Sequence, residues 1–437
     1  MSDWRSNPPV LPSLLYRWPE RMHLPHAGPM TIWHDHSGAL RDHVLLIFHR
    51  GSSGDPISGN GLHDITARLL LSGTRIRDRQ AVAESMERWG SSITARVTAD
   101  ATILSLRCLR DSREALLDLV EDILHHSTFP EEEVQRVRAQ KLDSLRADLN
   151  DPGTLATLLV LALFFEGTPY SHPSQGTLSG IETLERPDIL EAHRRLLHSG
   201  VSLSGLGPEP GPWVRCASQW PQVSEKKEDS LAFQKRKTLA VYPREGSVQS
   251  EIRMAIPVPP DLSFHSVLIL NTIFGGQFSS RLNLNLREQH GYTYGIRSTL
   301  VRRRHARYIL VTAAVHNEAT LPALQEIQNE LRGLADSGPR VNEQEAAVTF
   351  LSGSMARALE SPDAFLGKIL DSILAGDPED HFIQFHNRLQ SLSLNNLKET
   401  ASRLFGEDAE TVTVAVGAPD TVQSLPSALL LTDHPFV

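Results

Sequence analysis

Cysteine is scarce in this chain: only two cysteines, Cys108 and Cys216, occur among its 437 residues. A fold built on disulfides needs several cysteine pairs, and a cysteine-rich zinc site needs closely spaced pairs, so the sequence excludes both. Low cysteine content is typical of a reducing compartment. We therefore expect a cytoplasmic protein.

Long hydrophobic runs are also missing. The most apolar stretch, residues 155–165, has about half the length that a membrane-spanning helix requires, so it predicts a buried helix and no membrane partner. The N-terminal residues mix tryptophan, proline and charged side chains without an unbroken apolar segment. This pattern predicts no signal peptide.

Positive charge is too sparse for a nucleic-acid-binding surface. The chain has 43 Lys and Arg residues against 52 Asp and Glu, which gives a formal net charge of -9. Dispersed basic residues in an acidic chain predict no nucleic-acid partner. The one dense basic run, residues 302–304, precedes a predicted strand, and we interpret it as a solvated turn, with contact to an acidic partner surface as the minor alternative.

The hydrophobic pattern of the first half predicts both strands and helices. The predicted strands end near Phe48 or cover 92–97 and 102–109, and the predicted helices cover 62–71, 79–89, 112–125 and 130–149. The second half repeats this order with strands over 251–257, 294–300 and 308–315, helices over 262–274 and 280–289, and two later helices. Similar segments lie about 210 residues apart, which indicates a duplicated domain.

We predict two homologous domains, residues 1–207 and 230–437. They are joined by a linker, residues 208–229, which is rich in proline, glutamate and lysine. Helices and antiparallel-looking strands cluster within each half without strict alternation. The predicted fold class is therefore α+β, with an antiparallel-rich sheet in each domain covered by helices on one face.

One segment of the second half, FGGQFSSRLNLNLREQHGYTYGIRS, has a distinctive order of residues. A Gly-Gly turn precedes Ser-Arg-Leu and Leu-Arg-Glu, and Tyr294 follows seven residues after Arg287. This segment resembles the second-domain signature of the pitrilysin-like zinc metallopeptidases (family M16, the inverted zincins). The segments LPHAGPMTIWHDHSG and GTPYSHPSQGTLSGIETL resemble first-domain segments of that family, so the resemblance extends over most of the chain. It implies two homologous α+β domains.

Catalytic members of this family carry His-x-x-Glu-His on the helix after a Gly-rich loop, and a further metal-binding Glu on a later helix. The corresponding segment here is GLHDITARLLLSGT, which places Asp64, Ala67 and Arg68 at the three motif positions. Counting back from the Asp-Pro pair after the later helix places the last ligand position at Ser144, or at Asp143 if the register shifts by one.

These replacements remove the chemistry of the motif. Two neutral imidazoles one helical turn apart hold Zn²⁺, and the carboxylate between them deprotonates the bound water. Ala67 cannot take a proton, and the permanent charge of Arg68 repels a divalent metal. We therefore predict no metal in this chain.

Two other histidine positions offer weaker metal sites. His63 has Thr66 and Ala67 at i+3 and i+4, so no second ligand shares its helix face, and we interpret it as a surface or turn-facing residue. The triplet His34-Asp35-His36 could present two ligands on one face of a strand. The same pattern fits an exposed loop or strand end, and no third ligand is placed.

Arg287 lies near the end of a predicted helix that Gly291 terminates, and Tyr294 begins the next strand, so a tight turn can bring the guanidinium and the phenol to one ligand. The resemblance implies that this pair binds the substrate backbone near the scissile bond and that the tyrosine assists the developing oxyanion. In the structural alternative, Arg287 caps its helix or pairs with Glu288, and Tyr294 is a half-buried strand residue.

The preferred hypothesis combines the loss of the zinc motif with the retention of Arg287 and Tyr294. The chain cannot cut a peptide bond alone, and it is a non-catalytic subunit that binds peptide substrate beside a homologous catalytic subunit. The resemblance implies that this partner carries His-x-x-Glu-His and the zinc. A second hypothesis is a structural or assembly subunit without peptide contact, and the least favoured is an independent metallopeptidase with an unrecognised site.

Overall fold

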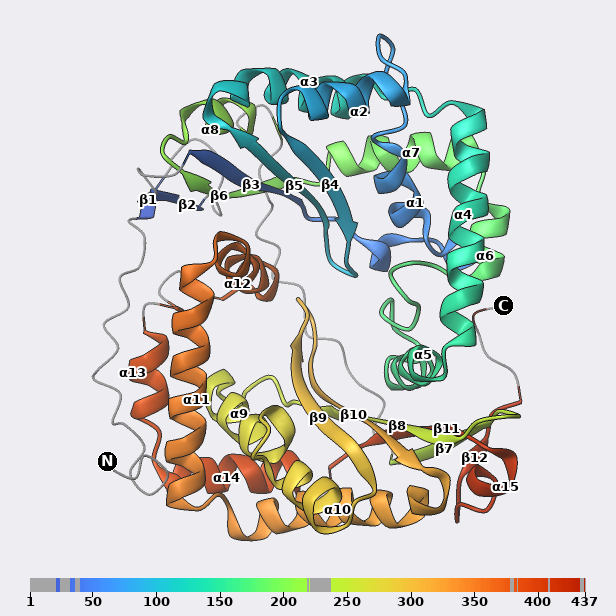
Figure 1. Ribbon diagram of the computed structural model, residues 1–437, viewed down its shortest axis with the longest axis vertical. Helices are drawn as coiled ribbons and strands as arrows, with labels where there is room; N and C mark the ends of the chain where they lie inside the picture. Colours follow the sequence, from blue (N-terminus) through green and yellow to red (C-terminus); the bar gives the residue numbers. More distant parts are fainter. Residues whose placement is uncertain are drawn as a thin grey trace, which may run out of the picture.

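The computed structural model describes residues 21–23, 32–35, 40–217, 220, 237–377, 381–382, 384–407, 409–432 and 436. Its strands form two six-stranded sheets, one from each half of the chain, with the orders β1-β2-β6-β3-β5-β4 and β12-β7-β11-β8-β10-β9. In Figure 1 the first half lies above the second, and each sheet has its own helices. The orders β2-β6-β3-β5-β4 and β7-β11-β8-β10-β9 correspond strand by strand, whereas the edge strands β1 and β12 come from opposite ends of their halves. The predicted α+β class is confirmed.

The elements of the first half agree closely with the hydrophobic pattern. They are β1 (Arg21–His23), β2 (Ile32–Asp35), β3 (Arg41–Phe48), α1 (Leu62–Leu69), α2 (Arg79–Arg88), β4 (Ser92–Val97), β5 (Thr102–Leu109), α3 (Arg113–His126), α4 (Glu131–Asn150), α5 (Pro152–Phe164), α6 (Leu178–Thr183), α7 (Arg186–Leu197), β6 (Val201–Gly207) and α8 (Gly211–Ala217). Strands β4 and β5 have the predicted bounds. Helix α4 begins with three glutamates and ends at Asn150, and the carboxylate of the next residue, Asp151, accepts the Thr154 N–H and so caps α5.

The second half repeats this series. Its elements are β7 (Thr238–Pro243), β8 (Gln249–Pro257), α9 (Phe264–Asn271), the π-helical segments Thr272–Gly276 and Asn283–Gln289, β9 (Thr293–Arg302), β10 (Arg307–His316), α10 (Thr320–Ser337), α11 (Val341–Glu360), α12 (Pro362–Ala375), α13 (Phe385–Gln390), α14 (Leu394–Phe405), β11 (Val412–Gly417), α15 (Pro419–Val422) and β12 (Leu429–Leu430). Most neighbouring strands pair antiparallel, whereas β11 with β7, β12 with β7 and β2 with β6 are parallel. The sheets are therefore antiparallel-rich, as predicted.

The central strand β3 is buried on both faces, which explains its unbroken apolar run. Val44 and Leu46 pack with the helices of the first half. Leu45 and Ile47, which point to the other face, belong to the cluster that contains α12 of the second half. In Figure 1, α12 lies directly beneath the first sheet.

Helix α5 makes the reciprocal contact with the second sheet. Leu159 and Val160 pack with strand β11 in one apolar cluster. The guanidinium of Arg253 in β8 donates to the Gly153 carbonyl at 3.1 Å and to the Thr157 hydroxyl at 2.9 Å. The buried helix predicted at 155–165 is thus confirmed, and it joins the two halves. No helix in the described ranges has the length and apolar content to cross a membrane.

The predicted linker, residues 208–229, begins within the first core. Trp213 of α8 is fully buried, and its indole N–H donates to Asp42 at 2.8 Å. Asp42 also forms a buried ion pair with Arg113 of α3. The residues that follow, 221–236, lie outside the described ranges. Helix α8 therefore packs with the first half, and the domain bounds stay a prediction.

The arginine run at 302–304 joins the two halves, and its interpretation as a solvated turn is wrong. The Arg303 guanidinium lies 4.9 Å from the ring centroid of Phe165 and 5.0 Å from that of Tyr170, both in the first half. The next backbone N–H donates to Asp100 at 3.0 Å. Cations over aromatic faces are favourable contacts, and here they cross between the two sheets.

Replacing Arg303 by alanine should lower the free energy of unfolding by about 1–2 kcal/mol, because a partly desolvated cation–π contact is lost. Urea denaturation at neutral pH measures the change. Arg304→Ala is the matched control, since the contact of Arg304 with Asp100 uses the backbone N–H and survives the substitution. Equal stability of the two variants would show that the aromatic contact contributes nothing.

Candidate functional site

Helix α1 carries Asp64, Ala67 and Arg68, the three positions that the sequence predicts to replace the zinc motif. Ala67 is buried, with 2% of its surface exposed. The Arg68 Nε donates to an Asp64 carboxylate oxygen at 2.8 Å, and the Nζ of Lys141 in α4 lies 2.8 Å from the same oxygen. One carboxylate and two cations therefore lie together at the positions predicted to replace the zinc motif.

Lys141, which the sequence analysis did not single out, faces α1 from the later helix. Its side chain is 3% exposed, whereas Ser144 and Asp143 are exposed on α4. The signal was present in the sequence, because Lys141 shares the buried face of α4 with Val137 and Leu145. A lysine on an apolar helix face must find an anionic partner, and here that partner is Asp64.

Electrostatics at this position disfavour a divalent metal. Burial lowers the pKa of Lys141, and the nearby Asp64 charge opposes this shift. A zinc ion placed at Asp64 would have to displace a buried ammonium and would lie one turn from a guanidinium. No group of three or more His, Cys, Asp and Glu side chains within the described ranges is arranged to hold a metal ion.

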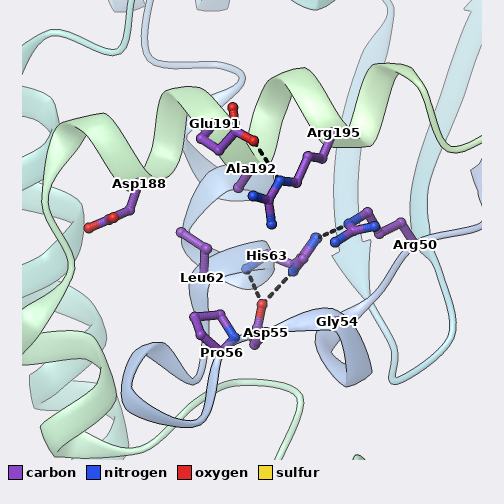
Figure 2. A pocket seen from close by; sticks show the side chains of 10 residues that line it. All are labelled: Arg50, Gly54, Asp55, Pro56, Leu62, His63, Asp188, Glu191, Ala192 and Arg195. Carbon is purple, nitrogen blue, oxygen red and sulfur yellow. Dashed lines mark hydrogen bonds and ion pairs between the residues drawn. The ribbon is translucent and has the colours of Figure 1, made fainter.

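His63 is buried, so its interpretation as a surface residue is wrong, whereas its ring does face the loop before α1. It is 3% exposed, its Nδ1 bonds to the Asp55 carboxylate, and its Nε2 lies 3.1 Å from the Nε of Arg50 (Figure 2). His34 is also buried and packs edge-on against Phe365 of α12 at 4.5 Å, which rules out an exposed loop for that residue. The side chain of Asp35 and all of His36 lie outside the described residues.

The second half places Arg287 and Tyr294 at one pocket. This pocket has a volume of about 480 Å³, and the two side chains line it together with Phe278, Asn283 and Phe350. Tyr294 is 85% exposed and Phe278 is 69% exposed. The Arg287 guanidinium lies 4.4 Å from the centre of the Phe278 ring, and its Nε is 3.4 Å from Glu288. The Glu288 contact of the structural alternative is thus present, while Tyr294 is exposed and not half-buried as that alternative requires.

Two glycines, Gly291 and Gly275, allow the backbone conformation around this pocket. Gly291 adopts a φ of 66°, and its N–H donates to the Arg287 carbonyl at 3.2 Å, so the helix ends where the sequence predicts. A Cβ at Gly275 would lie 2.9 Å from the backbone nitrogen of Ser298, which explains why a glycine stands where the helix meets strand β9.

Side chains occupy the outer edge of β9 next to the pocket. Asn283 donates to the Ile296 carbonyl at 2.8 Å and accepts the Ile296 N–H at 3.3 Å. Asn271 donates to the Ser298 carbonyl at 3.4 Å. The strand edge is therefore satisfied at these positions, and the side chains of Arg287 and Tyr294 line the pocket beside it.

Two domain matches decide the family. Residues 35–177 match the domain described as Insulinase (Peptidase family M16), and residues 214–351 match the Peptidase M16 inactive domain. The chain belongs to peptidase family M16. The predicted motif positions Asp64, Ala67 and Arg68 lie within the first M16 match, and the Arg287 and Tyr294 pocket lies within the second.

The M16 relatives carry different names. The chain is 20% identical over 364 residues to "Uncharacterized zinc protease YmxG" of Bacillus subtilis, covering 82% of this chain and 89% of the relative. It is 20% identical over 374 residues to "Non-peptidase homolog YmxG" of Helicobacter pylori, covering 82% and 84%. Both kinds of name occur, so family membership alone does not tell whether a member cleaves peptides. The residues at the motif positions are the better guide to this question.

Solved structures show the same fold. A peptidase M16 inactive domain from Pseudomonas fluorescens matches with a TM-score of 0.81 at 22% identity, covering 91% of this chain and 97% of that one. A Helicobacter pylori protease matches with a TM-score of 0.80 at 16% identity, covering 92% and 100%. At such identities the likeness establishes the fold alone.

Proposed function

We propose that this chain is the non-catalytic, substrate-binding subunit of a two-subunit zinc metallopeptidase. Its partner is a homologous subunit that carries His-x-x-Glu-His and binds the zinc. The present chain supplies Arg287 and Tyr294 to peptide held near that zinc. The observation that carries the proposal is the contrast between a motif position filled by ion pairs and an open pocket lined by two hydrogen-bonding side chains.

The replaced motif explains why the chain would not cut peptide bonds alone. A zinc hydrolase needs a metal-bound water and a base to deprotonate it. Ala67 offers no base, and Asp64 is already paired with Lys141 and Arg68. Hydrolysis in this proposal therefore takes place at the partner's metal.

The pocket of the second half has features that suit an extended peptide. Guanidinium and phenol groups can donate to backbone carbonyl oxygens, which every peptide presents. The exposed rings of Phe278, Tyr294 and Phe350 add apolar surface beside these donors. Such contacts bind the peptide backbone, so other contacts would determine which substrate sequences are preferred.

Co-purification tests the proposed partnership. A tagged chain should recover a protein of the same family that contains His-x-x-Glu-His, and the purified pair should hydrolyse peptides while either subunit alone does not. Zinc should be found in the pair at one ion per partner subunit. Stoichiometric zinc in the isolated chain, with hydrolysis that a chelator abolishes, would contradict the proposal. Cell fractionation tests the cytoplasmic location that the sequence predicts.

Arg287→Ala should weaken peptide binding to the assembled pair by about 10- to 150-fold, because one charged hydrogen-bond donor is worth about 1.5–3 kcal/mol. Fluorescence anisotropy of a labelled peptide, with a partner whose catalytic Glu is replaced, measures the affinity without turnover. The matched control is Arg332→Ala on the exposed surface of α10. Unchanged affinity with intact assembly would favour the structural or assembly subunit instead.

A further inference from the structure

A second pocket lies in the first half of the chain. It has a volume of about 430 Å³ and is lined by residues of the β3–α1 loop, by the start of α1 and by α7. Figure 2 shows two guanidinium groups, those of Arg50 and Arg195, approaching this pocket from different elements. His63 lies between them at the pocket wall. None of these residues has a role in the proposed peptide site.

Arg50 is oriented by a hydrogen-bonded chain that starts in the core. Asp55 accepts the backbone N–H groups of Gly61 at 2.8 Å and of His63 at 3.1 Å, and it also bonds to Nδ1 of the His63 ring. Because the Nδ1 proton points to Asp55, the Nε2 atom carries the lone pair and accepts the Arg50 Nε–H at 3.1 Å. The Arg50 guanidinium is thus held in place before any ligand arrives.

Arg195 reaches the same pocket from α7. Its Nε donates to Glu191 at 2.6 Å, which fixes the guanidinium on the pocket side of the helix (Figure 2). Among the described residues, the terminal nitrogens of Arg50 and Arg195 have no hydrogen-bond partner. Two forked donor groups are therefore available to one ligand.

The acidic residues at this pocket do not supply the missing partner. Asp55 is 1% exposed at its side chain and accepts the three bonds described above. Glu191 is shared between Arg194 and Arg195, and Asp188 accepts the backbone N–H of Glu185. Each carboxylate is already engaged.

The two cations disfavour one another. Burial lowers the pKa of Arg50, and the charge of Arg195 lowers it further, against the opposing effect of Asp55 and Glu191. An anion between the two guanidinium groups would offset this repulsion and accept hydrogen bonds from their terminal N–H groups.

We propose that Arg50 and Arg195 form a binding site for a small ligand that carries a carboxylate or a phosphate group. Planar guanidinium groups bind both oxyanions through paired N–H···O bonds. Carboxylates and phosphates share this chemistry, so the proposed ligand is a compact oxyanion. The proposal is independent of the peptide-binding role, because it uses no residue of the second half.

Isothermal titration calorimetry on the full chain tests this site with three probes: inorganic phosphate, an N-acetylated dipeptide with a free C-terminal carboxylate, and the same dipeptide as its C-terminal amide. We expect saturable binding of the phosphate, of the free carboxylate, or of both, and no binding of the amide. Arg195→Gln should weaken binding by tenfold or more, which corresponds to about 1.4 kcal/mol. Arg403→Gln, an exposed arginine of the second half, is the matched control.

Arg195→Gln is the decisive variant. The Arg195 side chain is 55% exposed, so the substitution leaves the core intact. Arg50→Gln tests the second donor, and thermal unfolding of both variants verifies that they fold. Binding of phosphate alone or of carboxylate alone identifies the source and supports the site. Absence of binding by the unaltered chain at millimolar concentration, or equal affinity in Arg195→Gln, overturns the proposal.

Discussion

Replacing Tyr294 by phenylalanine should lower kcat of the reconstituted pair by about 100- to 1,000-fold, because one preorganised donor to a developing oxyanion is worth about 3–4 kcal/mol. KM should change much less, since the bond strengthens as the carbonyl oxygen gains charge. The ring itself remains, and Tyr294 is 85% exposed, so the fold should not change. Initial rates with a fluorogenic peptide, measured over a range of substrate concentrations, separate kcat from KM.

Tyr292→Phe is the matched control for this result. Tyr292 lies two residues earlier in the same turn, and its ring stacks on His290 at 4.9 Å. Loss of its hydroxyl should leave both kinetic constants within about twofold, as expected for a position that makes no transition-state contact. If Tyr294→Phe behaves like Tyr292→Phe while the pair still assembles, the tyrosine takes no part in the chemistry.

The local elements of this fold could be predicted from the sequence because their causes are local. Strands over 92–97 and 102–109 follow from alternating apolar residues. The start of α4 follows from Glu131, Glu132 and Glu133 in its first turn, and the end of the helix before β9 follows from Gly291 in a left-handed conformation.

The contacts between the two halves could not be predicted in this way. Helix α12 packs on the first sheet and α5 on the second, so residues far apart in the sequence come into contact, as Thr157 and Arg253 do. The apolar pattern shows that each helix is buried, but it does not show which sheet buries it. For the same reason, the arginine run at 302–304 resembles a solvated turn until the aromatic rings of Phe165 and Tyr170 are placed beneath Arg303.

The two candidate sites differ in how much the sequence could predict. Arg287 and Tyr294 are close in the chain and joined by one turn, so their common pocket follows from local geometry. The ion pair of Asp64 with Lys141 links two helices and depends on their packing. The periodicity of α4 could have placed Lys141 on the buried face, but its partner could come only from the fold.

Asp64→Asn should lower the free energy of unfolding by about 3 kcal/mol, because removing one member of a buried ion pair leaves the other charge without compensation. Lys141 is 3% exposed at its side chain, and its ammonium would keep only the more distant charge of Asp148. The substitution keeps the size and shape of the side chain, so the loss reports charge. Urea denaturation at neutral pH, where Lys141 is charged in the unfolded chain, measures it.

Arg68→Gln separates the buried partner of Asp64 from the exposed one. Arg68 is 54% exposed, and exposed ion pairs one helical turn apart contribute less than about 1 kcal/mol. Lys141→Met should lower the free energy of unfolding by an amount between those of the two other variants. The Asp64 carboxylate would then keep its ion pair with Arg68 and some contact with water. If Arg68→Gln destabilises the chain as much as Asp64→Asn, the buried lysine does not hold this position together. The expected order of losses instead indicates that a buried ammonium joins α1 to α4 at the positions predicted to replace the zinc motif.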